Sequence, residues 1–252
     1  MPPIRLTRAV RALLISCIVL FLIQQTADQF MGGNVIGWLG LIPANFAFGF
    51  RFWQIVTYSF LHGDVTHLLL NMLMLVFIGS ELEALWGTVR FLRYYFICVV
   101  SAGALYLALQ IGIWGGTGLN TPMVGASGGI YGLLMAYGLL FGERVLLFMM
   151  LFPMKAKHFV WILMAVEFFT SLFSGRGGLS SAAHLGGMVA GFAALWARAT
   201  IQVAQRRKKA GLSPAGKAKK RSSGGHLKLL IDNERQRGGG DDDADSGPKT
   251  WH

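Results

Sequence analysis

Charged residues are scarce in this chain of 252 residues. Only 14% are Asp, Glu, Lys or Arg, against roughly 25% in an average soluble domain, and 54% are hydrophobic. Residues 94–142 contain no Asp, Glu, Lys or Arg at all, whereas a helix needs about 20 apolar residues to cross a bilayer. This composition excludes an ordinary water-soluble enzyme and predicts an all-α, polytopic membrane protein.

Cysteine is also scarce, with only Cys17 and Cys98, both inside apolar stretches. Buried thiols of this kind behave as small hydrophobic side chains, so no disulfide is expected. The formal net charge of +11 is concentrated, because most Lys and Arg residues lie from Arg198 onward among Gly, Ser and Asp. This distribution argues against nucleic-acid binding. It predicts a membrane domain over residues 1–200 and a largely disordered, basic cytoplasmic tail over residues 201–252.

Six apolar stretches are long enough to span a bilayer as helices. They cover residues 10–27, 67–85, 94–114, 123–142, 159–173 and 180–198. The apolar residues 145–153 are expected along the membrane surface, because Pro153 interrupts the pattern before the fifth span. The aromatic-rich connection 28–66 is expected to form a partly buried hairpin at the level of the lipid headgroups.

Lys and Arg in the short connections indicate how these six helices are oriented. One side would hold Arg5, Arg8, Arg11, Arg90, Arg93, Arg144, Lys155 and Lys157, and the other only Arg51 and Arg176. The positive-inside rule places the richer side in the cytoplasm, so both termini are expected there. We therefore expect a multi-pass integral protein of a bacterial inner membrane, embedded in the lipid bilayer. The sequence leaves its oligomeric state open.

The fourth predicted span begins with Gly125-Ala126-Ser127-Gly128. This order places a serine hydroxyl beside free backbone N–H groups at a helix N-terminus, which favours developing negative charge. The flanking Gly125 and Gly128 allow a substrate carbonyl to approach Ser127 and these donors together. Such a motif is more often a turn or a packing site, so Ser127 is a candidate nucleophile only if a base accompanies it.

His184, in the sixth predicted span, is the candidate base. Gly187 and Gly191 follow it on roughly the same helical face, and small residues there allow close contact with another helix. If this face packs on the fourth span, His184 and Ser127 lie at similar depth and form a Ser-His dyad. We expect no acid as a third member, because Asp28 and Asp64 are the only acids on that side and Glu167 has no evident role.

His67 and Asn71 share one face of the second predicted span, at positions i and i+4. Aimed at the same cavity, they would donate hydrogen bonds to the oxyanion that forms when Ser127 attacks. They could instead join two helices by hydrogen bonds. A metal site at His62, His67 and His184 is a further alternative, but no carboxylate or thiol clearly accompanies them, so no metal is expected.

These motifs, over residues 52–197, resemble the rhomboid family of intramembrane serine proteases. Their order along the chain matches the family's His-x-x-x-Asn, Gly-x-x-x-Glu-x-x-x-Gly, Gly-x-Ser-Gly and Ala-His-x-x-Gly-x-x-x-Gly signatures. The matching residues are His67, Asn71, Gly79, Glu83, Gly87, Gly125, Ser127, Gly128, Ala183, His184, Gly187 and Gly191. Trp53-Gln54 departs from the family's Trp-Arg pair in the first loop.

The resemblance implies a six-helix bundle in which Ser127 attacks a peptide bond and His184 acts as base and then as acid. It further implies that His67, Asn71 and the Ser127 N–H hold the oxyanion, and that Tyr131 packs against the imidazole. The expected substrates are transmembrane segments of single-pass proteins, and no metal or cofactor is expected. Two alternatives stay open: an inactive rhomboid-like protein that binds membrane helices, and a small transporter or channel.

Overall fold

The computed structural model describes residues 6–112, 118–148, 152–174 and 178–209. The chain divides into two units, residues 1–206 and 207–252. Most of the predicted polar tail, residues 210–252, lies outside the described residues. The helices described below belong to the first unit, apart from the last turn of the final helix.

Five helices of the described residues are long and apolar enough to cross a membrane. They are α1 (Arg8–Phe30), the continuous helix Val65–Trp86, α7 (Thr88–Gly112), α9 (Ala156–Phe173) and α10 (Gly178–Lys209). The helix Val65–Trp86 consists of α5 (Val65–Met74), the π-helical turn η2 (Leu75–Gly79) and α6 (Ser80–Trp86). The predicted all-α polytopic architecture is therefore confirmed.

A sixth apolar helix, α8 (Ser127–Leu140), has only 14 residues. Its length is about 21 Å, against a hydrocarbon core of about 30 Å, so the count of six full spans stays a prediction. The predicted start at residue 123 is wrong. Met123 forms an isolated bridge with Leu41 through two backbone hydrogen bonds of 2.9 and 3.0 Å, which keeps the chain extended before the helix begins.

Two other boundaries differ from the sequence predictions. Residues 145–155 contain an antiparallel pair of strands, β1 (Val145–Phe148) and β2 (Phe152–Lys155), which apolarity alone did not distinguish from a surface segment. The last helix, α10, continues to Lys209, beyond residue 198, where the sixth predicted span ends.

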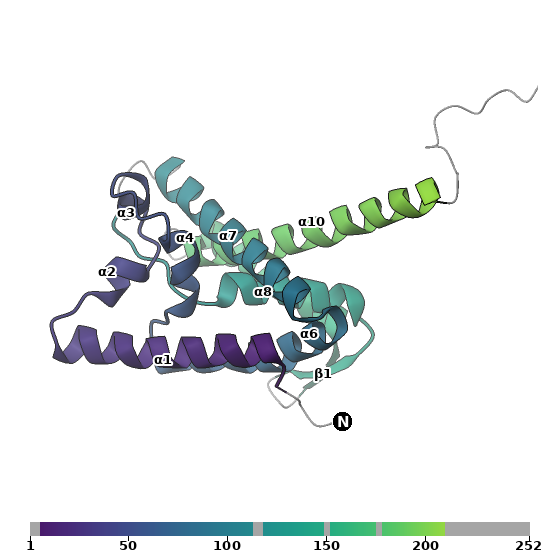
Figure 1. Ribbon diagram of the computed structural model, residues 1–252, viewed down its shortest axis with the longest axis horizontal. Coiled ribbons are helices and arrows are strands. Elements are labelled where there is room, and N and C mark those ends of the chain that lie inside the picture. Colours follow the sequence, from purple (N-terminus) through teal and green to yellow (C-terminus); the bar gives the residue numbers. More distant parts are fainter. Residues whose placement is uncertain (1–5, 113–117, 149–151, 175–177, 210–252) are drawn as a thin grey trace, which may run out of the picture. The chain divides into compact units, whose positions relative to one another are not determined.

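The connection 28–66 does not form the predicted hairpin. It folds into four short helical segments: α2 (Val35–Leu39), α3 (Pro43–Ala47), α4 (Gln54–Thr57) and the 3₁₀ turn η1 (Tyr58–Phe60). Figure 1 shows α2, α3 and α4 gathered on one side of α1, and α3 and α4 contact α7. The fully buried Gln54 side chain joins these segments, donating to the Gly37 carbonyl at 3.1 Å and accepting from the Ile42 N–H at 3.2 Å. A glutamine, which both donates and accepts, is therefore well suited to this position.

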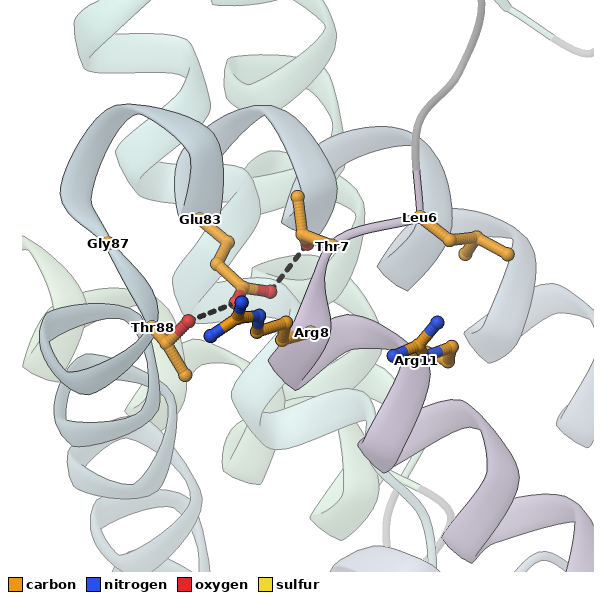
Figure 2. Close-up of a pocket in the computed structure, with 7 residues that line it drawn as sticks. All are labelled: Leu6, Thr7, Arg8, Arg11, Glu83, Gly87 and Thr88. Atoms are coloured by element: carbon orange, nitrogen blue, oxygen red, sulfur yellow. Dashed lines mark hydrogen bonds between the residues drawn. The ribbon is translucent and has the colours of Figure 1, made fainter.

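Glu83 fixes the N-terminus of α1 against α6 and α7. Its carboxylate accepts the backbone N–H groups of Ala9 and Val10 at 2.9 and 3.0 Å, replacing the missing side-chain cap of a helix that begins after Thr7. The hydroxyls of Thr7 and Thr88 donate to the same carboxylate at 2.5 and 2.6 Å (Figure 2). This acid therefore holds three helices together beside an open pocket that includes Arg8 and Arg11.

Candidate active site

Ser127 and His184 come from different helices and meet at a hydrogen-bonding distance. Ser127 is the first residue of α8, and His184 lies in the second turn of α10. The His184 Nε2 atom lies 2.7 Å from the Ser127 Oγ atom. Ser127 is buried, and the side chain of His184 is 18% exposed, so the hydroxyl and the imidazole occupy a largely enclosed site.

Glycines bring α8 and α10 close enough for this contact. A β-carbon on Gly187 would lie 2.1 Å from the carbonyl oxygen of Gly128, and one on Gly191 would lie 3.2 Å from the Cα of Gly132. The first spacing leaves no room for a β-carbon, and the second is tighter than most real contacts of a β-carbon. The predicted glycine face of α10 therefore lies directly on the backbone of α8, one turn beyond His184.

Tyr131 lies one turn after Ser127 on α8 and stacks on the His184 imidazole. The two ring centroids are 4.2 Å apart and the planes are inclined by only 8°. The stack prevents the imidazole from tilting out of its plane, but it restricts rotation of the ring within that plane less. A further contact is needed to fix which ring edge faces Ser127.

Glu167 of α9 supplies that contact. Its Oε1 atom lies 3.1 Å from His184 Nδ1, on the ring edge opposite Ser127, and also accepts a hydrogen bond from the Tyr131 hydroxyl. The expectation that no acid accompanies the Ser-His pair is therefore wrong. The sequence did carry one signal, because Glu167 is the only acid of α9, and an acid within an apolar helix usually faces a polar partner.

Gly125 places His67 next to Ser127. Its backbone has φ +123°, which a residue with a side chain rarely adopts. A β-carbon here would lie 2.8 Å from both Cε1 and Nε2 of His67 and 3.6 Å from Ser127 Oγ. The Gly125 N–H donates to the carbonyl of Tyr58 at 3.0 Å. The segment before α8 is thus anchored where the imidazole of His67 approaches the serine.

Two sets of hydrogen-bond donors are available near this end of α8. The N–H groups of Ser127, Gly128 and Gly129 precede the first helical hydrogen bond, which Ile130 donates to Ala126. Asn71, one turn beyond His67 on α5, is buried, and its Nδ2 has no hydrogen-bond partner among the described residues. An unpaired buried donor is costly, and a substrate oxyanion would satisfy it.

His62 lies behind His67. It is fully buried, and neither of its ring nitrogens has a hydrogen-bond partner in the part of the chain described here. The rings of His62 and His67 meet edge to face, with centroids 5.2 Å apart. Burial, followed by the proximity of His67, lowers the pKa of His62 to about 4. Among the described residues, no three His, Cys, Asp or Glu side chains are grouped to hold a metal ion.

The sequence also matches a family model. The model of the Rhomboid domain matches residues 49–200, which include every helix that contributes to this site. The chain belongs to the rhomboid family. Together with its apolar helices, this makes the rhomboid described here an integral membrane protein.

Relatives of this rhomboid occur in bacteria, plants and a protozoan. It is 28% identical over 188 residues to Rhomboid protease GlpG of Yersinia pseudotuberculosis, covering 74% of this chain and 60% of the relative. It is 32% identical over 143 residues to RHOMBOID-like protein 4 of Arabidopsis thaliana, covering 56% of this chain and 32% of the relative. It is 34% identical over 82 residues to Rhomboid-like protease 3 of Toxoplasma gondii, covering 32% of this chain and 30% of the relative. The chain thus spans less than two thirds of the length of each of these relatives.

Proposed function

We propose that this rhomboid is an intramembrane serine endopeptidase that hydrolyses peptide bonds in or near transmembrane segments of single-pass membrane proteins. The observation that carries the proposal is the 2.7 Å contact between Ser127 Oγ and His184 Nε2. A serine hydroxyl is a weak nucleophile until a neighbouring base removes its proton. Two relatives whose names describe them as proteases also support it.

The geometry supports an acyl-enzyme reaction. Ser127 Oγ bonds to the scissile carbonyl carbon as its proton passes to His184 Nε2. The carbonyl oxygen becomes an oxyanion near the Ser127 N–H, the Asn71 amide and His67. His184 then returns the proton to the leaving amine as the C–N bond breaks. A water molecule, deprotonated by His184, finally hydrolyses the ester and regenerates the serine.

The same proposal includes the orientation and location of the protein. We place both termini in the cytoplasm and the protein in a bacterial inner membrane, since Lys and Arg favour one set of connections. Ser127 and His67 then lie near the outer ends of their helices. A substrate helix has to unwind there to expose its backbone, so small or helix-breaking residues near the bond favour cleavage.

The proposal is tested with the full chain in liposomes that contain a single-pass model substrate. We expect Ser127→Ala and His184→Ala to lower kcat by about 10³-fold or more, because the two residues act as a unit. Ser174→Ala and His158→Ala, at exposed positions, are matched controls and should cut at the parental rate. A fluorophosphonate probe should label Ser127 only while His184 is present.

Cleavage by both site variants at the parental rate would remove the basis for the proposal. A parent that binds the substrate helix without cutting it would instead identify the inactive rhomboid-like alternative.

A further inference from the structure

We infer that Glu167 is a positioning residue for His184, so that catalysis uses a Ser127–His184–Glu167 triad rather than a serine and a histidine alone. The inference rests on the proposed function. It is carried by the 3.1 Å contact between Glu167 Oε1 and His184 Nδ1, on the opposite side of the ring from the 2.7 Å contact with Ser127.

The placement of Glu167 on α9 is specific. Its neighbours Val166 and Phe168 are 53% and 50% exposed, whereas Glu167 is 8% exposed. It is also the only buried residue in the second half of this helix. Burying a carboxylate in apolar surroundings is costly unless donors satisfy it. The orientation of α9 therefore turns its one acid toward the site and the apolar neighbours Val166 and Phe168 away from it.

Two donors converge on the same carboxylate oxygen. The Tyr131 hydroxyl and His184 Nδ1 both contact Glu167 Oε1, and Tyr131 also stacks on the imidazole. Tyr131 therefore holds the carboxylate by its hydroxyl and the ring by its face. The stack keeps the imidazole from tilting, and the contact with the carboxylate keeps the ring from rotating within its plane.

The carboxylate also selects the tautomer of the imidazole. An ionised carboxylate only accepts hydrogen bonds, so Nδ1 carries the ring proton and donates a hydrogen bond to Glu167. The Nε2 lone pair then faces the Ser127 hydroxyl. When Ser127 attacks, its proton moves to Nε2 and the resulting imidazolium lies against the negative charge of Glu167. That proton later goes to the leaving amine, and the Nδ1 proton stays on the ring throughout.

The effect of Glu167 on His184 has to be distinguished from the effects of the other titratable groups nearby. His67 of α5 interacts electrostatically with His184, Asp64 acts on His67, and His67 in turn acts on His62. Tyr131 of α8 and Glu167 of α9 face the imidazole directly. The isosteric change Glu167→Gln removes the charge of one of these groups and leaves the others in place.

The decisive experiment compares the parent with Glu167→Gln in liposomes across pH. We expect kcat to fall about ten- to hundred-fold with little change in KM, because the lost interaction is strongest in the transition state. The acidic limb of the kcat profile should also move to lower pH, because a neutral amide no longer stabilises the imidazolium. Glu143→Gln, which removes an exposed acid, is the matched control and should leave both unchanged.

Two further measurements keep the inference testable if Glu167→Gln folds poorly. Glu167→Asp keeps the charge and should retain the parental acidic limb even where the shorter side chain lowers kcat. The ¹⁵N NMR signals of His184, assigned with His184→Ala, should show protonated Nδ1 and unprotonated Nε2 at neutral pH in the parent.

The outcomes separate the two proposals. An active parent whose Glu167→Gln variant keeps the same kcat and the same acidic limb overturns the role of Glu167 while the proposed function stands. A parent that cuts no substrate overturns the proposed function. In that case an unprotonated His184 Nδ1 would show in addition that the carboxylate does not set the tautomer.

Discussion

Gly187 of α10 lies directly against the carbonyl group of Gly128 in α8, so that a β-carbon on Gly187 would be 2.1 Å from that oxygen. This contact lies one turn from His184 and one residue from Ser127. The crossing of two helix backbones therefore sets the distance between the nucleophile and its base. Any side chain at this crossing has to push the two helices apart, because a backbone carbonyl cannot move as a flexible side chain can.

Gly187→Ala should therefore impair both stability and cleavage. We expect the free energy of unfolding to fall by about 1–3 kcal/mol, the usual cost of overpacking. We also expect kcat to fall as Ser127 and His184 separate. Gly112→Ala is the control, since a β-carbon at Gly112 meets nothing within 4 Å. Thermal unfolding in detergent and cleavage in liposomes measure the two effects. Equal midpoints and equal rates for the two variants would contradict this view of the crossing.

Asn71→Ala should separate activity from stability. We expect kcat to fall about 10²–10³-fold, the typical effect of removing one oxyanion donor. The folded protein should be equally stable or slightly more stable, because the change removes a buried Nδ2 that has no partner among the described residues. Asn120→Ala, at an exposed position, should change neither quantity. A parallel loss of stability and activity would indicate instead that Asn71 joins helices.

The sequence predicted those parts of the site that local motifs encode. Ser127 at a helix start and His184 with its glycines one and two turns later are local patterns, and the structure brings these residues together. Glu167 was missed for a physical reason. Hydrophobic periodicity assigns a rotation to a helix only when polar residues mark one face, and α9 is apolar on nearly every side.

The extended segment before α8 was missed for a different reason. An apolar run does not show where a helix begins, and the bridge between Leu41 and Met123 that delays it joins residues far apart in the sequence. The short helices of the connection 28–66 likewise depend on the side-chain hydrogen bonds of the buried Gln54. Tertiary contacts of this kind override the local pattern.

Glu83→Gln should destabilise the attachment of α1. The carboxylate accepts hydrogen bonds from two backbone N–H groups and two hydroxyls, and the amide nitrogen of Gln would face some of these donors. Leaving a buried donor unpaired costs about 1–3 kcal/mol. Glu81→Gln is the matched control, because Glu81 forms an exposed ion pair with Arg144, and such pairs contribute about 0–1 kcal/mol. In limited proteolysis and thermal unfolding, Glu83→Gln should be much less stable than Glu81→Gln.

His62 should make the fold sensitive to acid. Its pKa is about 4 in the folded protein and about 6.5 in an unfolded chain, so the unfolded chain binds the extra proton between these values. Stability should therefore fall as the pH drops from 6.5 to 4, by up to about 3 kcal/mol. His62→Phe should abolish this component and cost little at pH 7, since neither ring nitrogen has a partner among the described residues. Thermal unfolding midpoints at several pH values test this, with His158→Phe, at an exposed position, as the control. Parallel curves for the parent and His62→Phe would show that protonation of this imidazole does not set the acid sensitivity.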